Sequence, residues 1–206
     1  MCELGISQAA TSVKVQPDGK ILVAGGGIDF FLLRYNADGS LDPTFINKNA
    51  IIVKEGLASA HFMSQTEIAR SIDLQSDGRI VVAGDVTSPT GSIIYYGLAC
   101  FNTDGSLDIK TPIPLINPIT KKECPISSVK GVKVLQGGKI AVVGAVQMHR
   151  DSTRDYTILR CESNLALDNS FGVSGQVTRF VDGESSENRS IVLQTDRKIV
   201  VAGFTI

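Results

Sequence analysis

A segment of fourteen residues recurs four times along the 206-residue chain without gaps. The copies are Ser12–Gly25, Ser71–Gly84, Gly131–Gly144 and Ser190–Gly203, and the first reads SVKVQPDGKILVAG. Their starting points lie 59, 60 and 59 residues apart. A fixed period of this length is typical of proteins built from stacked units, because one unit alone cannot bury its hydrophobic face.

Each copy predicts a β-hairpin. Before the turn, apolar residues alternate (Val13 and Val15 in the first copy), which indicates a strand with one buried face. The turn residues Pro17, Asp18 and Gly19 suit a tight reversal, because glycine supplies a positive φ. The apolar run that follows suits a strand covered on both faces. Arg197 takes the place of the turn glycine in the fourth copy, so we expect a strained or different turn there.

A glycine closes the second strand of every hairpin, and this predicts a bulge or a close approach of two backbones. These glycines are Gly25, Gly84, Gly144 and Gly203.

A second block follows the hairpin in the first three copies and predicts a third strand and a turn. The blocks are Phe30–Asp42, Tyr96–Asp108 and Tyr156–Asp168. We expect a fourth strand at 51–54 and at 176–181, because Phe45 and Phe171 stand at matching positions before them. The second copy lacks this phenylalanine and carries the proline-rich stretch Pro112–Pro118 instead.

Four short-connected strands per unit, without a sustained helical period, predict an all-β fold. We expect a β-propeller-like stack of four-stranded antiparallel blades, with about three and a half repeats of ~59 residues. The chain 1–206 is then a single repeat domain with units near 8–66, 67–126 and 127–185 and a partial unit at 186–206. A β-sandwich or an irregular β-solenoid fits less well, since a sandwich seldom repeats at a fixed period and solenoid coils are shorter.

The fourth copy has only its first two strands, so the predicted strands make three four-stranded blades and one additional hairpin. An unpaired hairpin exposes a strand edge that another chain can pair with. We therefore expect either self-association through these edges, giving a homo-oligomer, or a chain that is part of a longer array.

Three strings resemble the signature of the delta-60 repeat family: Val15–Gly25, Arg34–Phe45 and Leu167–Gly175. These are bacterial repeats assigned to a domain of unknown function with β-propeller character, and the resemblance covers nearly the whole chain. It implies a β-propeller-like fold and a secreted or cell-surface location, and it brings no catalytic residue and no known ligand. Gly137, Arg197 and the phenylalanine missing from the second copy depart from the pattern.

Composition excludes several classes of partner. Lys plus Arg is 20 and Asp plus Glu is 21, so the net charge of -1 provides no basic field for nucleic acid. No apolar run approaches the ~20 residues of a membrane-spanning helix. The first residues have neither the basic start nor the apolar stretch of a signal peptide, so we expect none in this chain.

The cysteines and histidines do not form a zinc signature. Cys2, Cys100, Cys124 and Cys161 contain no C-x-x-C pair, and His61 and His149 are far from them in sequence. Because Cys100 and Cys161 lie in apolar, strand-like runs, we expect buried free thiols rather than a disulfide.

The acidic turns are the strongest candidates in the sequence for a metal-binding site. Asn36, Asp38 and Asp42 present oxygens at alternating positions near a glycine, a pattern that can bind calcium, and Asn102–Asp108 repeats it. The spacing differs from an EF-hand loop, so we favour Asx-turns whose side chains bond local amides. Neither histidine has a repeated partner. We therefore expect no catalytic residue, no cofactor and no metal ligand.

These observations favour a non-catalytic binding or scaffold module that contacts a protein or a glycan through its loops or the ends of the propeller axis. The alternative is an enzyme of hydrolase or lyase type with its site in the central channel. A purely structural spacer within a longer array is a third hypothesis.

Overall fold

A computed structural model describes residues 9–50, 53–62, 66–115, 124, 126–147, 154–179 and 186–205. Within these ranges all regular secondary structure is β-strand. No helix in this part of the chain has the length and apolar character needed to cross a membrane. The strands are β1 (Ala9–Val15), β2 (Ile21–Gly27), β3 (Phe30–Tyr35), β4 (Leu57–Ala60), β5 (Glu67–Leu74), β6 (Ile80–Thr87), β7 (Ile94–Phe101), β8 (Leu107–Ile113), β9 (Ile126–Val134), β10 (Ile140–Gln147), β11 (Arg154–Cys161), β12 (Gln176–Arg179), β13 (Ser186–Leu193) and β14 (Ile199–Thr205).

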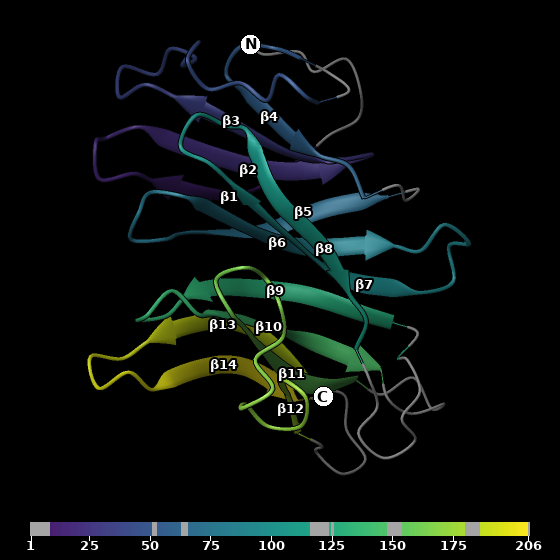
Figure 1. The fold of residues 1–206 in the computed structure, drawn as a ribbon. Coiled ribbons are helices and arrows are strands. Elements are labelled where there is room, and N and C mark those ends of the chain that lie inside the picture. Colours follow the sequence, from purple (N-terminus) through teal and green to yellow (C-terminus); the bar gives the residue numbers. More distant parts are fainter. Residues whose placement is uncertain are drawn as a thin grey trace.

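Consecutive strands pair in antiparallel order, which confirms the predicted all-β antiparallel fold. β1 to β4, β5 to β8 and β9 to β12 each form a run of four neighbouring strands, and β13 pairs with β14. The first two runs join into one eight-stranded sheet, because Gly26 and Gly27 of β2 pair with Ile68 and Glu67 of β5. Figure 1 shows the runs stacked one after another from the N-terminal end to the β13–β14 hairpin.

The predicted bulge is present in all four hairpins. The first strand carries one extra residue next to the partner of the closing glycine: Ala69 pairs with Gly84 and Ser71 with Ala83, so Arg70 is left without a partner in the ladder. The other hairpins show the same shift of register. A Cβ at Gly25, Gly84 or Gly144 would lie 2.0 to 2.1 Å from a backbone carbonyl oxygen of the first strand. The repeated glycine is therefore required by the close approach of two backbones.

Most of the core lies between successive units, and a smaller cluster of Phe31, Leu33 and Leu57 belongs to the first unit alone. On β6, Ile80 and Val82 belong to the cluster shared with the first unit, whereas Val81 and Ala83 belong to the cluster shared with the third unit. This accounts for the continuous apolar run of β6 and β10, which are covered on both faces as predicted. The prediction does not hold for β14, which is half-buried or exposed along its whole length.

The first strands of successive units lie next to one another along the stack. Side chains of β5 accept hydrogen bonds from the backbone of β9: the Val132 amide donates to Ser71 Oγ at 3.1 Å and the Val134 amide to Asp73 Oδ2 at 2.8 Å. The edge of β9 is thus satisfied by the side chains of its neighbour.

One predicted detail of the strands is corrected. The strand that pairs with β3 as the fourth strand of the first unit is Leu57–Ala60; of the predicted strand at 51–54, residues 51 and 52 lie outside the described residues. Gly56, with φ 73°, ends the turn that carries the chain back to pair with β3. The second unit also has a fourth strand, β8, which contains Pro112; proline is tolerated because β8 lies at the edge of its sheet. The fourth strand of the third unit lies where predicted, at Gln176–Arg179.

The cysteines that the structure describes are free and buried, as predicted for Cys100 and Cys161. Burial raises the pKa of Cys100 and Cys124 to about 11 and that of Cys161 to about 12. The thiols therefore stay protonated and unreactive at neutral pH. Cys2 lies outside the described residues.

Equivalent positions differ at the outer end of the stack. Val13 in the first unit is 65% exposed, whereas Ile72 and Val132 at the same repeat position are 6% and 4% exposed because a preceding unit covers them. Among the described strands, β14 pairs only with β13. Self-association through these uncovered surfaces stays a prediction.

Candidate functional site

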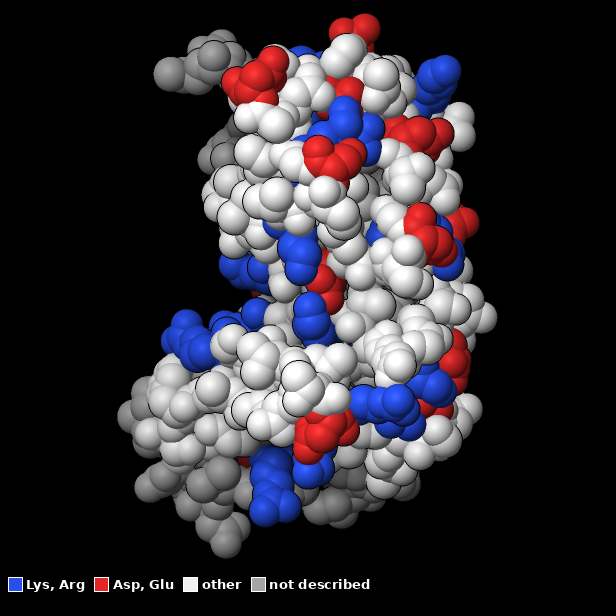
Figure 2. Space-filling view, turned by 90° about the vertical axis from the view of Figure 1, so that its left-hand side faces the viewer, with Lys and Arg blue, Asp and Glu red and all other residues white. Residues whose placement is uncertain are grey.

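In the first three units, the basic residue after the hairpin turn binds the aspartate that ends the second repeated block. Lys20 Nζ lies 2.7 Å from Asp42 Oδ2, and Arg34 Nε contacts the same oxygen at 2.7 Å. The third unit repeats this arrangement, with Lys139 and Arg160 at 2.8 and 2.6 Å from Asp168 Oδ2. In the second unit, where Cys100 takes the place of the strand arginine, Arg79 alone pairs with Asp108, at 3.1 Å. These ion clusters follow the edge of the molecule that carries the hairpin turns, where Figure 2 shows acidic and basic side chains interspersed.

These contacts support the structural interpretation of the acidic turns over calcium binding. The Thr44 amide and hydroxyl both donate to Asp42 Oδ1, while two cations occupy Oδ2. Asp38 accepts the Ser40 amide and Asp104 the Ser106 amide, as expected for Asx-turns. A calcium ion at Asp42 would have to displace two positively charged groups.

The clusters predict a loss of stability in acid. Burial alone would raise the pKa of Asp42, but hydrogen bonds from Lys20, Thr44 and Arg34 outweigh burial and lower the pKa far below the usual range. Asp42 therefore stabilises the fold above the unfolded pKa of about 4, and this contribution is lost as the pH falls toward the folded pKa. We expect Asp42→Asn to lower the free energy of unfolding by about 1–2 kcal/mol at pH 7.

Urea unfolding of wild type and Asp42→Asn between pH 7 and pH 2.5 measures this effect. The difference between the two proteins should shrink progressively below about pH 4, since the wild-type carboxylate becomes protonated on unfolding. A difference that stays constant over this range would show that the charge of Asp42 does not matter.

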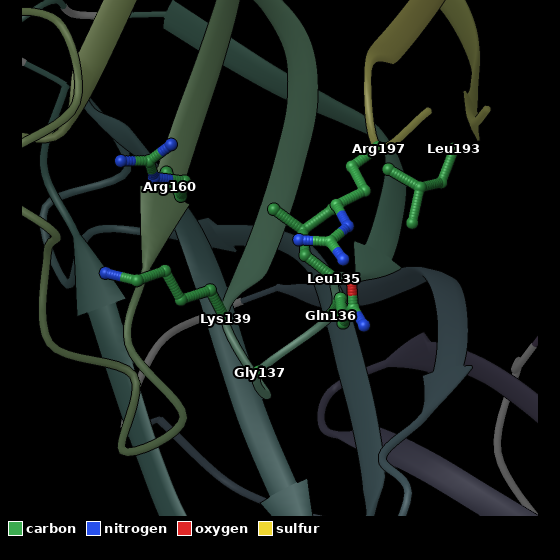
Figure 3. Close-up of a pocket in the computed structure, with 7 residues that line it drawn as sticks. All are labelled: Leu135, Gln136, Gly137, Lys139, Arg160, Leu193 and Arg197. Carbon is green, nitrogen blue, oxygen red and sulfur yellow. The ribbon is translucent and has the colours of Figure 1, made fainter. Parts of the chain in front are cut away.

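A cavity of about 350 Å³ opens between the turns of the third and fourth units, beside the ion cluster of the third unit. One wall comes from the β9–β10 turn and β11, and the other from the β13–β14 hairpin (Figure 3). The lining residues are Leu135, Gln136, Gly137, Lys139, Arg160, Leu193 and Arg197.

Arg197 differs from the other two cations of this cavity. Lys139 and Arg160 are paired with acidic side chains, whereas Arg197 makes no ion pair with any residue that the structure describes. Its φ is 70°, so the turn keeps the left-handed conformation of Gly19, Gly78 and Gly138 in the other units. The strain expected at Arg197 is confirmed, and an arginine in this region costs on the order of 1 kcal/mol relative to glycine.

The first strands of three successive units, β1, β5 and β9, bring a second cluster of charged side chains together. Asp73, which is 4% exposed, lies between Lys14 at 2.6 Å and Lys133 at 2.9 Å, and all three residues lie on the first strands of successive units. Burial would raise the pKa of Asp73, but hydrogen bonds from Lys14, the Val134 amide and Lys133 lower it. The carboxylate stays ionised at neutral pH, which suits an ion pair between units better than general acid chemistry.

The structure describes one of the two histidines, His61. His61 follows β4 and contacts Asp29 and Glu67 at the ends of the strands opposite the hairpin turns, while His149 lies outside the described residues. Sequence reasoning missed both partners of His61, because His61 and Glu67 do not recur in the other units and Asp29 recurs only as Asp155 of the third unit.

Two parts of the chain, residues 16–45 and 75–108, match the model of a family described as "Domain of unknown function (DUF5122) beta-propeller". The matches cover equivalent parts of the first and second units, from the glutamine before the hairpin turn into the second repeated block. This supports a β-propeller repeat family and carries no activity with it. No curated protein matches the chain.

Proposed function

We propose that the chain is a non-catalytic binding module of β-propeller type, built from four-stranded blades, whose hairpin-turn face engages an acidic group on a protein or a glycan. The observation that carries the proposal is Arg197, a strained and exposed arginine without an ion pair among the described residues, at the wall of a cavity that holds two further cations. A free guanidinium offers paired donors to a carboxylate, sulfate or phosphate.

The surroundings of Arg197 support recognition of an acidic group rather than of nucleic acid. Lys139 and Arg160 keep their carboxylate partners, so only a small excess of positive charge faces the cavity. Leu135 and Leu193 add apolar surface next to the cations. A mixed apolar and cationic wall suits an acidic sugar or an acidic peptide side chain, since both present a charged group on a less polar frame.

The test is binding of two probes, a sulfated oligosaccharide and a glutamate-rich peptide, by isothermal titration calorimetry at low and at physiological salt. We expect one probe to bind the wild type, and Arg197→Gly to weaken that binding about 10-fold, the loss of one charge-assisted hydrogen-bonding group. The variant restores the glycine of the other units, so its fold should be kept and slightly stabilised.

Lys48→Gly is the matched control, because Lys48 is exposed in the first unit and its removal changes the net charge by the same amount. We expect it to bind like the wild type. Absence of binding to either probe, or equal affinity of Arg197→Gly and wild type, would contradict the proposal.

A further inference from the structure

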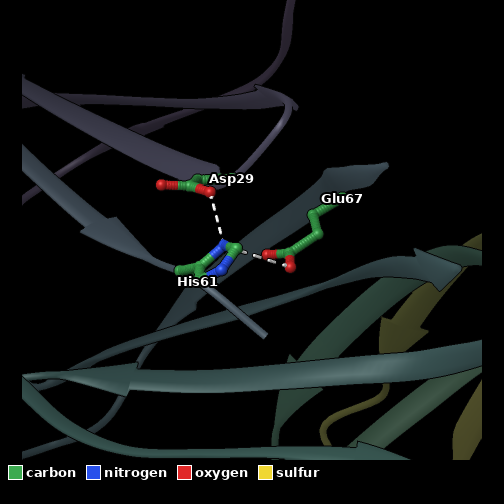
Figure 4. Close-up of side chains that lie close together, drawn as sticks. All are labelled: Asp29, His61 and Glu67. Carbon is green, nitrogen blue, oxygen red and sulfur yellow. Dashed lines mark hydrogen bonds and ion pairs between the residues drawn. The ribbon is translucent and has the colours of Figure 1, made fainter. Parts of the chain in front are cut away.

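One imidazole and two carboxylates converge where the first unit meets the second, at the ends of the strands opposite the hairpin turns. His61 Nδ1 lies 2.8 Å from Asp29 Oδ1 and 3.6 Å from Glu67 Oε1. Figure 4 shows the His61 ring between the two carboxylates. One donor atom from each residue falls within a group no wider than 4.8 Å.

Three different elements supply these side chains. Asp29 sits in the two-residue connection between β2 and β3, and His61 directly follows β4. Glu67 opens β5, where the register places it opposite Gly27 of the first unit and Val86 of the second. The cluster therefore spans the junction of the two units.

The lengths of two connections explain why only this junction has the cluster among the described residues. From the basic turn residue to the matching third-strand position the first unit has 14 residues, against 21 in the second and third units. Asp42 and Arg79 are 37 positions apart, whereas the equivalent separations are 31 positions from Asp108 to Lys139 and 30 positions from Asp168 to Lys198. The short connection carries Asp29 and the long one carries His61, so both departures from the repeat meet at one point.

The surrounding contacts hold the three side chains in place. Glu67 is fully buried, and its Oε1 accepts the Phe62 amide at 2.7 Å. The Phe62 ring packs edge-on against the buried Phe30 at 5.0 Å between centroids, and the Lys110 ammonium bonds the His61 carbonyl. The His61 side chain is 31% exposed, so solvent reaches the cluster from one side.

We propose that Asp29, His61 and Glu67 form a binding site for a divalent transition-metal ion such as Zn²⁺. Tetrahedral zinc with bonds of 2.0–2.1 Å separates its donor atoms by ~3.3 Å, and the observed separations of 2.8 and 3.6 Å lie on either side of this value. One imidazole nitrogen with two carboxylate oxygens favours zinc over calcium or magnesium, which prefer all-oxygen sites. Water from the exposed side completes the coordination.

Binding replaces a proton by the metal ion. In the present geometry the Nδ1 position of His61 is at hydrogen-bond distance from Asp29. A metal ion takes the lone pair of the unprotonated Nδ1, and any proton on that nitrogen leaves to solvent. Because the ligands come from both units, the bound ion ties the first unit to the second and stabilises the folded chain.

The experiment titrates chelator-treated full-length chain with zinc chloride by isothermal titration calorimetry, with cobalt absorption and the thermal unfolding midpoint as further readouts. We expect one ion per chain, and a higher unfolding midpoint with zinc than without. His61→Ala should lower zinc affinity at least ~100-fold and abolish the midpoint shift. Asp29→Asn should lower affinity by ~10–100-fold.

His149→Ala is the control, since it removes the only other histidine of the chain. It should bind zinc like the wild type. Glu67→Gln completes the set, and if burial of Glu67 prevents that variant from folding, the partly exposed Asp29 still tests the carboxylate contribution. Absence of zinc binding by the wild type, unchanged affinity in His61→Ala, or loss of binding in His149→Ala would each overturn the proposal.

Discussion

Gly84→Ala should lower the free energy of unfolding by at least about 3 kcal/mol, among the largest effects expected for a single methyl group. The new Cβ would lie 2.1 Å from the Ile68 carbonyl oxygen and 2.7 Å from the Ala69 Cα. Both are backbone atoms within the β5–β6 ladder, so no side chain can rotate away to make room. The strands must separate at the bulge, which also disturbs the packing of the second unit against the third.

Gly39→Ala separates this effect from the general cost of replacing glycine. Gly39 has a φ of 84°, and no atom of the described residues lies within 4 Å of the position that an added methyl group would take. Only backbone strain of about 1 kcal/mol is therefore expected. Urea unfolding of both variants measures the difference. Equal losses would show that the strand-closing glycines are not required by the close approach of backbones.

Phe45→Ala should cost about 3–4 kcal/mol, whereas Phe171→Ala, at the matching position of the third unit, should cost about 1 kcal/mol. Both rings lie beneath an arginine, at 4.4 Å from Arg34 and 4.5 Å from Arg160. Phe45 is fully buried, because the turn of the second unit covers it around Gly105. Phe171 is only partly buried, since no matching turn of a fourth unit covers it in the described part of the chain.

Chemical denaturation of the two variants tests whether burial comes from the neighbouring unit. The arginine contact is common to both sites, so it cancels in the comparison. A cost for Phe171→Ala as large as that for Phe45→Ala would mean that the third unit is covered by further protein, and it would contradict the stack of three four-stranded units and a hairpin.

The repeat made much of the fold predictable, because four aligned copies show which features geometry requires. The hairpins, the bulge opposite Gly84 and the strained turn at Arg197 all follow from comparing positions. The strand that pairs with β3 was expected at 51–54, six residues after Phe45 as in the third copy, but it is Leu57–Ala60. The turn at Gly56 that leads into it has its counterpart at Gly175 of the third copy, another glycine of positive φ directly before a fourth strand. The first copy reaches this turn 14 positions after Asp42 and the third copy 7 positions after Asp168, so the spacing of the third copy misplaces the strand in the first.

The candidate sites were less predictable for the same reason. Comparison of copies identifies what recurs, and His61 and Glu67 do not recur, while Asp29 has an equivalent only in Asp155 of the third unit. Asp29, His61 and Glu67 are brought together by two connections of unusual length. The number of residues in a connection does not by itself predict which side chains become close in space. Arg197 could be found, because it breaks the glycine pattern of the turn, but its place at a cavity with Lys139 and Arg160 requires the packing of the fourth unit on the third.

Binding of an acidic ligand to the hairpin-turn face can be mapped residue by residue. The isotope-labelled chain is titrated with the sulfated oligosaccharide or the glutamate-rich peptide, and amide chemical shifts are followed in nuclear magnetic resonance spectra. We predict that the shifts concentrate in the two turns that face the cavity, Gln136–Lys139 and Thr195–Lys198, and that they are strongly reduced in Arg197→Gly at the same probe concentration. Shifts confined to other surfaces, or unchanged spectra at saturating probe, would contradict acidic-ligand binding at this face.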